Sequence, residues 1–380
     1  MNRLIIIISL FFISGLSRSL YEDDYLVKVI KEHKEAVAAV AISPDGKYLA
    51  SGGDDKLLLI TDWKTLEPLY KYADNYFPPK AIKFTAVNNL FVSSGPDIKL
   101  IDLNNQTFAV YQGNATHIWS IDYAPERNKL TAGSYDYKIK VWDVASQKVE
   151  LTLEGHEKST LPVAFSPDEK YIVSGSLDKT VRVWNAKTGE LMRTLEIHSD
   201  NIYDVEFYPS GKYFASASRD KTIRLWDFET GKVVMTYTGH DKGILDIEFL
   251  PDGNHLVSAS LDGSIRLWQT KTGKMVYTFT GHVGAVNCLA VSPDGRYMAS
   301  GGADAKVMIW NLSRKIFVEY AFYDEFEAEK SQSPLFDPKH KGEKKEDYEA
   351  RMVKAVELEN QIIEKYYQKY LEDLKNKQFK

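Results

Sequence analysis

The sequence predicts an all-β fold made of seven consecutive four-stranded antiparallel units, followed by a helical tail. An aspartate marks each unit, and the spacing is 42 residues at every step but one, which is 39: Asp55, Asp97, Asp136, Asp178, Asp220, Asp262 and Asp304. Short runs such as "YDVEF", "YFASAS" and "TIRLWD" alternate in polarity, which is the period of half-buried strands. Turn sequences such as "SPDG" separate these runs, and residues 25–312 show no helical period.

The N-terminal residues differ from the rest of the chain. Arg3 precedes an apolar run over 4–13, and the small residues Gly15, Ser17 and Ser19 follow it. About ten apolar residues are too few to span a hydrocarbon layer of about 30 Å. We therefore expect a signal peptide over 1–19, a secreted or periplasmic protein and no integral membrane segment after cleavage. The alternatives are an uncleaved anchor or a misassigned start, and the latter would leave the protein in the cytoplasm.

Each repeat carries three further residue types at fixed distances from its aspartate. A histidine lies 22 residues before it in five repeats: His33, His156, His198, His240 and His282. The other two repeats have Asn75 and Asn114 at that position. A serine lies four residues before the aspartate in the same five repeats: Ser51, Ser174, Ser216, Ser258 and Ser300. A tryptophan follows six residues after it in five repeats: Trp142, Trp184, Trp226, Trp268 and Trp310.

These repeats resemble the WD40 family. The Gly-His pairs at 155–156, 239–240 and 281–282, the regularly spaced aspartate and the "LWD" ending carry the resemblance, which covers 25–312. It implies a seven-bladed β-propeller, which we place at 25–318. The segment "YLVKVIKEH" (25–33) matches "LMRTLEIH" (191–198), the end of a repeat, but precedes the first full one. We therefore expect it to supply the outer strand of the last blade, which would close the ring.

Serine, histidine and aspartate are also the residue types of an acyl-transfer triad. A nucleophile is needed once per active site, whereas this trio recurs in five of the seven repeats. The resemblance implies instead that Asp, His, Ser and Trp form a hydrogen-bonded chain within each blade, where both imidazole nitrogens find partners. We therefore predict no catalytic residue and no enzymatic activity. A propeller-based hydrolase or lyase is the alternative, and its candidates Asp54, Lys80, Arg219 and Asn287 form no obvious pair.

Composition and motifs argue against several classes of ligand. The net charge of −5 lacks the basic surplus typical of nucleic-acid-binding proteins, so we expect no nucleic-acid partner. Cys288 is the single cysteine, and the histidines outside the repeat positions (His117, His255 and His340) are scattered, so no zinc spacing occurs. No glycine-rich nucleotide motif is present. We predict no metal and no cofactor.

The resemblance places partner binding on the face where the first strand of each blade begins. Two positions per blade line the central opening there, one five residues after the repeat histidine and one just before the aspartate. Blades 3 to 6 offer aromatic, aliphatic and arginine side chains of the kinds enriched at binding hot spots. The predicted partner-binding residues are Trp119, Tyr135, Leu161, Leu177, Tyr203, Arg219, Leu245 and Leu261. The predicted function is a non-enzymatic scaffold that binds a protein or peptide; the alternative is that loops or the tail cover this face.

The tail differs in composition from the repeats. Pro334 and Pro338 indicate a linker over 319–342, and a charged amphipathic helix is predicted over 343–380. Its apolar stripe is Tyr348, Met352, Val356, Ile363, Tyr367, Tyr370 and Leu374, interrupted at Glu359. The helix could pack on the propeller, bind another protein or itself, or stay solvated. The segment "KGEKKEDYEAR" resembles tails of secreted bacterial proteins. The signal predicted over 1–19 favours an exported scaffold, and a cytosolic signalling or assembly scaffold is the alternative if 1–19 is no signal.

Overall fold

The computed structural model describes residues 25–73, 77–103, 108–338, 340 and 342–375. The predicted signal peptide over 1–19 lies outside these residues and stays a prediction. The described chain forms two compact units, a β unit over 25–312 and a helical unit that begins at Ser313.

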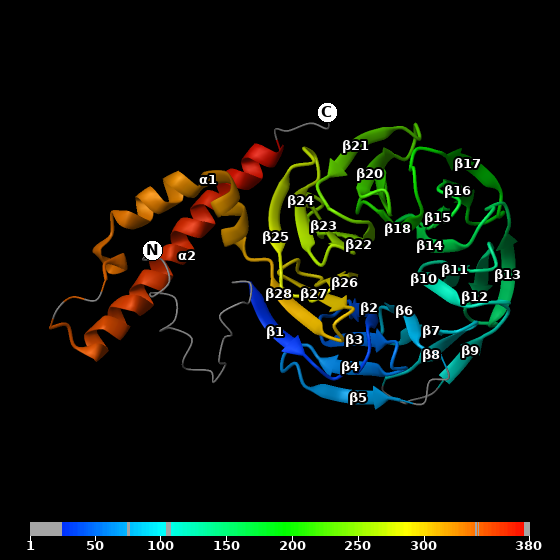
Figure 1. The fold of residues 1–380 in the computed structure, drawn as a ribbon, viewed down its shortest axis with the longest axis horizontal. Coiled ribbons are helices and arrows are strands. Elements are labelled where there is room, and N and C mark those ends of the chain that lie inside the picture. Colours follow the sequence, from blue (N-terminus) through cyan, green and yellow to red (C-terminus); the bar gives the residue numbers. More distant parts are fainter. Residues whose placement is uncertain (1–24, 74–76, 104–107, 339, 341, 376–380) are drawn as a thin grey trace. The chain divides into compact units, whose positions relative to one another are not determined.

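In the described residues, the β unit consists of seven four-stranded antiparallel sheets arranged as the blades of a ring (Figure 1). Blade 1 comprises β2 (Val37–Ile42), β3 (Tyr48–Gly53), β4 (Leu58–Asp62) and β5 (Pro68–Tyr72). Blade 2 comprises β6 (Pro79–Phe84), β7 (Leu90–Ser94), β8 (Asp97–Ile101) and β9 (Phe108–Tyr111). Blade 3 comprises β10 (Ile118–Ala124), β11 (Lys129–Ser134), β12 (Ile139–Asp143) and β13 (Lys148–Leu153). Blade 4 comprises β14 (Thr160–Phe165), β15 (Tyr171–Ser176), β16 (Val181–Asn185) and β17 (Leu191–Leu195).

The remaining three blades follow the same order, from an inner strand to an outer one. Blade 5 comprises β18 (Ile202–Phe207), β19 (Tyr213–Ser218), β20 (Thr222–Asp227) and β21 (Val233–Thr238). Blade 6 comprises β22 (Ile244–Phe249), β23 (His255–Ser260), β24 (Ile265–Gln269) and β25 (Met275–Phe279). Blade 7 comprises β26 (Val286–Val291), β27 (Tyr297–Gly302), β28 (Val307–Asn311) and, from the start of the β unit, β1 (Leu26–Ile30). The prediction of a seven-bladed propeller is confirmed.

Strand β1 closes the ring as predicted. It pairs antiparallel with β28, where Val29 lies opposite Met308 and Ile30 opposite Val307. The last blade is therefore built from both ends of the β unit, and its β28 edge is covered by β1.

The core lies between neighbouring blades. One cluster joins Ile30, Val307 and Ile309 of blade 7 to Val37 and Leu59 of blade 1, and each of these side chains is buried. The corresponding clusters at the other seams include the blade tryptophans Trp142, Trp184, Trp226 and Trp268. Each blade buries an apolar face against the next, so no blade is stable alone.

A bulge near the start of the inner strands positions the site described below. In β18, Ile202 lies opposite Ser218 and Asp204 opposite Ala217, so Tyr203 is an extra residue. Trp119 in β10 and Leu245 in β22 occupy the same position in their own strands. Because a bulged residue leaves the ladder and its side chain is re-aimed, one side chain per blade is directed away from the regular pleat.

The helical unit contains α1 (Arg314–Ser331), a short 3-10 helix at Pro334–Phe336 and α2 (Lys345–Lys375). The prediction of a linker over 319–342 is wrong for 319–331, and the β unit ends at Leu312 instead of residue 318. The reason is packing, because Val318 and Phe326 of α1 form a buried cluster with side chains of α2. Among the described residues, no helix is both long and apolar enough to span a bilayer.

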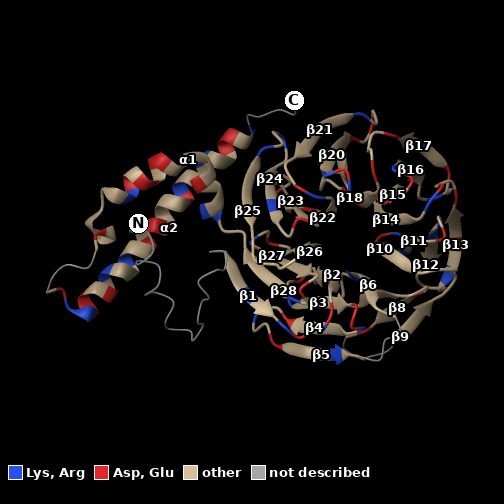
Figure 2. Ribbon diagram, in the orientation of Figure 1, with Lys and Arg blue, Asp and Glu red and all other residues tan. Residues whose placement is uncertain are grey.

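Helix α2 buries a stripe that agrees with the predicted one at Met352, Tyr370 and Leu374 and differs from it elsewhere. Its buried residues are Met352, Ala355, Ile362, Tyr366, Tyr370 and Leu374, whereas Val356 is 38% exposed. Glu359 does not break the packing, because its Oε1 accepts hydrogen bonds from Lys315 and Lys330 of α1, both at 3.0 Å. Acidic and basic residues are interspersed along α2, whereas the acidic residues of α1 lie between basic residues near its two ends (Figure 2).

Substituting Phe326 with alanine should destabilise the pairing of α1 and α2. The Phe326 ring is fully buried in their shared cluster, and removing such a ring costs about 3–5 kcal/mol. We expect the helical signal at 222 nm to melt at a lower temperature than in the unchanged protein. Tyr323→Ala is the control, because Tyr323 lies in the same helix but is 42% exposed. Equal melting of the two variants would contradict the packing described here.

Candidate functional site

Hydrogen bonds within the blades connect the repeat residues. In blade 5, His198 Nδ1 donates to Asp220 at 2.8 Å, and His198 Nε2 accepts from Ser216 Oγ at 2.7 Å. Trp226 Nε1 donates to the same Ser216 oxygen at 2.9 Å. Blades 4, 6 and 7 repeat the arrangement with the equivalent distances between 2.7 and 2.9 Å. Both imidazole nitrogens, the serine hydroxyl and the indole N–H of this network have hydrogen-bond partners. The network therefore stabilises the register of the strands.

The other three blades depart from this arrangement. In blade 1, His33 joins Asp55 at 3.1 Å and Ser51 at 2.8 Å, but Thr61 replaces the tryptophan. In blade 3, Trp142 Nε1 donates to the backbone oxygen of Gln112 at 2.9 Å. Asp136 of that blade accepts from Ser134 Oγ at 2.7 Å. In blade 2, Asp97 begins β8, and Asn75, at the histidine position, lies outside the described residues. Trp142, Asp97 and Asp136 are therefore not part of a His-Ser-Trp chain among the residues that the structure describes.

The buried position of this trio excludes nucleophilic attack. Ser216 has no exposed surface and His198 is 7% exposed. Burial alone would raise the pKa of Asp220, but hydrogen bonds from His198 and Thr222 outweigh it and hold this pKa well below its usual range. Burial lowers the pKa of His156 in blade 4, despite its bond to Asp178. A substrate cannot reach the hydroxyl, so the trio is structural.

The seven inner strands enclose a central cavity of about 790 Å³. Its wall at the end where these strands begin, here called the cavity mouth, includes Trp119, Tyr203, Leu245, Lys80 and Asn287. The first three are half-buried, and Trp119 packs edge-to-face on the exposed Tyr135 with ring centroids 6.0 Å apart. The bulges thus bring two predicted aromatic residues and one leucine from blades 3, 5 and 6 to a single opening.

The other predicted partner residues are placed differently. Leu161 is 2% exposed and does not line the cavity, because an aliphatic side chain is more stable when its neighbours cover it. Leu177 and Leu261 are half-buried outside the cavity wall, and Arg219 is exposed with its Nε 3.9 Å from Asp200.

The polar candidates at the opening do form a pair, contrary to the prediction. Lys80 Nζ lies 2.5 Å from Asp54 Oδ1 across blades 1 and 2. Asn287 donates to the backbone oxygen of Val37 at 2.9 Å. Lys80 and Asp54 neutralise each other, and the Asn287 amide is hydrogen-bonded to the backbone. Neither arrangement presents a free acid-base pair.

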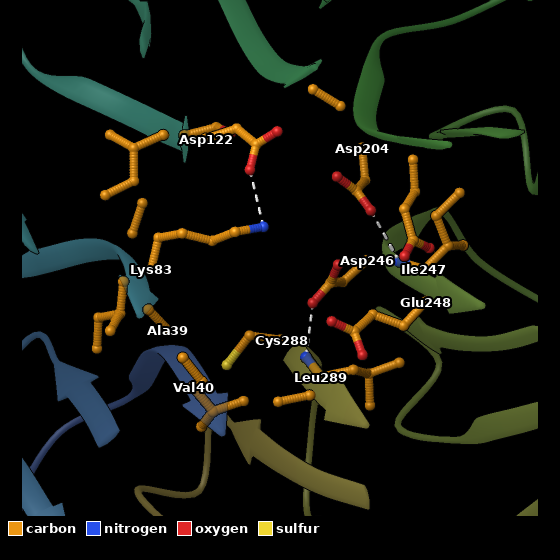
Figure 3. Close-up of a pocket in the computed structure, with 18 of the residues that line it drawn as sticks. Ala39, Val40, Lys83, Asp122, Asp204, Asp246, Ile247, Glu248, Cys288 and Leu289 are labelled. Carbon is orange, nitrogen blue, oxygen red and sulfur yellow. Dashed lines mark hydrogen bonds and ion pairs between the residues drawn. The ribbon is translucent and has the colours of Figure 1, made fainter. Parts of the chain in front are cut away.

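Carboxylates line the cavity below the mouth, and Figure 3 shows several of them pointing inward. Strand β18 contributes Asp204 and Glu206, and β22 contributes Asp246 and Glu248. Opposite them, Lys83 of β6 is paired with Asp122 of β10 at 2.8 Å.

The half-buried position of these carboxylates in the cavity wall changes their pKa values. Desolvation raises the pKa of Asp204 to about 6, although hydrogen bonds from Asp246 and two backbone amides oppose the shift. Desolvation likewise raises the pKa of Glu248 to about 7. The pKa values of Glu206 and Asp246 rise well above the ordinary range for the same reason, and neighbouring carboxylates add to the effect.

The acidic wall is not among the predicted site residues, although the sequence contains a signal for it. The motifs "YDVEF" (203–207) and "LDIEF" (245–249) place an acid at the same two positions of consecutive repeats. Alternation alone does not distinguish a polar strand face in solvent from one that faces a closed cavity.

Comparison with known proteins gives relatives that share part of the chain. The Periodic tryptophan protein 2 homolog of Dictyostelium discoideum is 28% identical over 37% of this chain and 16% of its own length. A subunit of Chromatin assembly factor 1 from Mus musculus is 29% identical over 32% of this chain and 18% of its own. Nuclear distribution protein nudF 1 of Talaromyces marneffei is 36% identical over 33% of this chain and 29% of its own. The chain therefore spans less than a third of each relative, and these eukaryotic proteins do not support the resemblance to secreted bacterial ones.

The family described as WD domain, G-beta repeat matches six segments of the chain: 24–62, 105–143, 147–185, 189–227, 231–269 and 273–311. The unmatched stretch 63–104 contains three strands of blade 2, the blade with Asn75 at the histidine position. The matched segments cover more than half of the sequence and carry the His-Ser-Asp-Trp networks. The chain belongs to the WD40 repeat family.

Proposed function

We propose that the protein is a non-enzymatic scaffold that binds a protein or peptide at the cavity mouth. The observation that carries the proposal is the convergence of Trp119, Tyr203 and Leu245 on one opening through three equivalent bulges. Aromatic side chains at an accessible concave surface are typical of binding hot spots.

The proposed binding surface is smaller than the surface expected from the sequence. Tyr135, which packs on Trp119, and the exposed Arg219 extend the mouth outward over blades 3 and 5. Leu177 and Leu261 stay as flanking positions, and Leu161 contributes to the interior. One relative is named as part of a chromatin assembly factor, and a role in an assembly is consistent with a scaffold.

Removing the aromatic side chains should abolish partner capture without unfolding the propeller. We expect Trp119→Ala and Tyr203→Ala each to weaken the captured complex by about 30-fold or more, the effect of losing a hot-spot residue. The measurement is titration of the purified partner, identified by capture with the full chain, against each variant.

The matched control is Met192→Ala, because Met192 is 47% exposed on the outer strand β17. This variant should bind the partner as the unchanged chain does. Undiminished binding by both aromatic variants would remove the cavity mouth as the binding surface.

The predicted signal peptide adds a second part to the proposal, that the scaffold acts outside the cytoplasm. Sequencing of the mature N-terminus tests it. A chain that begins after Ser17 or Ser19 supports export, whereas a chain that retains residues 1–19 favours the cytosolic signalling or assembly scaffold.

A further inference from the structure

The carboxylates of the cavity wall connect neighbouring blades. Each inner strand is the edge of its own sheet, so its inward backbone N–H groups have no partner within that sheet. Carboxylates from the preceding blade accept these bonds. Asp204 accepts from Ile247 N at 3.0 Å, and Glu206 accepts from Phe249 N at 2.7 Å. Asp246 accepts from Leu289 N and Glu248 from Val291 N, both at 2.6 Å. Four side chains therefore hold two seams, between blades 5 and 6 and between blades 6 and 7.

The charges around these four groups do not balance. Lys83 is the cation nearest to them in the described wall, and it is paired with Asp122. At the mouth, Lys80 is paired with Asp54. The other titratable side chains of the wall are Tyr203 and Cys288, and burial raises the pKa of the Cys288 thiol. Strands β2 and β14 add no titratable group to the described wall.

Full ionisation would therefore place four negative charges on half-buried side chains of one cavity, beside a lysine that is already paired with Asp122. Like charges in a partly desolvated cavity repel strongly, since the effective dielectric constant is far below that of water. Protonation relieves the repulsion and preserves the seams, because a neutral carboxyl group still has a carbonyl oxygen that accepts the backbone N–H.

We propose that these four carboxylates form a proton-sensitive pair of seams, which are tight while the groups share protons and loosen as rising pH ionises them all. The proton-sensitive seams follow from the geometry of β18, β22 and β26 and do not depend on the proposed partner. It lies directly beneath the cavity mouth, because Tyr203 and Leu245 immediately precede Asp204 and Asp246.

The raised pKa values support the proposal and determine whether the folded state gains or loses stability as the pH rises. Desolvation is the largest cause of the raised pKa of both Asp204 and Asp246. Because the folded-state pKa values exceed those of the unfolded chain, the folded protein binds more protons. The resulting stabilisation is complete below about pH 4 and is lost as the pH rises through about 6 to 7.

The test compares the full-length chain with the double variant Asp204→Asn/Asp246→Asn. Asparagine keeps an oxygen that can accept from Ile247 N and Leu289 N but cannot ionise. The Tm of the unchanged protein should fall by about 5 °C or more between pH 5 and pH 8 at constant ionic strength. In the double variant, this fall in Tm between pH 5 and pH 8 (here called the pH slope) should be at most half as large. Amide exchange at Ile247 and Leu289, corrected for its intrinsic pH dependence, should show the same loss of protection in the unchanged protein alone.

The matched control is Glu229→Gln/Asp241→Asn, which removes two exposed acids from the loops of blades 5 and 6. It should keep the full slope. Should the first double variant not fold, Asp204→Asn and Glu248→Gln are compared singly, and each should reduce the slope. A Tm of the unchanged protein that is flat from pH 5 to pH 8, or a slope that the cavity variants leave intact, would overturn the proposal.

Discussion

Replacing Ile30 with aspartate should unfold the propeller at its closing blade. Ile30 is 6% exposed, pairs with Val307 and packs in the cluster shared by blades 7 and 1. An unpaired carboxylate there would lose its hydration and disrupt the pairing of β1 with β28, which joins the two ends of the β unit in one sheet. We expect a loss of more than about 4 kcal/mol, a large part of the 5–15 kcal/mol that stabilises an ordinary domain.

Urea unfolding followed by tryptophan fluorescence measures this effect, because five tryptophans are buried in the blades. Val27→Asp is the control, since Val27 lies in the same strand but is 41% exposed, and it should cost less than about 1 kcal/mol. Ile30→Ala should fall between them, at about 2–4 kcal/mol. If the two aspartate variants unfolded at the same urea concentration, β1 would not be the strand that secures the ring.

The features of the fold that could be predicted are those that depend on short sequence patterns and recur in each repeat. Strand alternation, turn residues and the 42-residue spacing recur in almost every repeat, so errors in one copy are corrected by the others. The turn at Gly295 illustrates this, because its φ of 69° lies in the region that favours glycine at the end of "SPDG". The closing strand could be predicted because 25–33 repeats the end of a blade where no blade precedes it.

Helix α1 could not be predicted in this way. Its buried residues Ile316, Phe317, Val318 and Phe326 show no regular helical spacing, and Lys and Glu dominate the rest. Its stability comes from packing against α2, which is a tertiary contact between segments about 40 residues apart. The residue pattern within either segment alone does not contain that contact.

The candidate site shows the same limit. The position five residues after the histidine correctly selected side chains of the cavity mouth such as Trp119 and Tyr203, because the bulge recurs with the repeat. The rule gave no information on burial, so Leu161 was included although it lies in the interior. The four cavity acids could not be predicted, because their position around one cavity depends on closure of the whole ring.

Removing the carboxylate of Asp220 should destabilise blade 5 by about 3–5 kcal/mol, the cost of breaking a buried charged network. Its side chain is 5% exposed and accepts from His198 Nδ1 at 2.8 Å and from Ser199 N at 3.0 Å. It also accepts from Thr222 N at 3.0 Å and Thr222 Oγ1 at 2.6 Å. Asp220→Ala leaves all four donors without this acceptor. Thermal unfolding of the full chain should show the loss.

Asp136→Ala is the matched control, because Asp136 holds the same repeat position in a blade without the histidine. Its carboxylate accepts from Ser134 Oγ and Lys138 N, so its loss should cost about 1 kcal/mol. The two variants should also differ in acid. The pKa of Asp220 is depressed, so its contribution is present above about pH 4 and is lost as the pH falls through the folded-state value. The stability gap between Asp220→Ala and the unchanged protein should therefore narrow in strong acid. Equal losses for the two substitutions at pH 7 would mean that the turn around the aspartate, and not its bond to the imidazole, holds the blade.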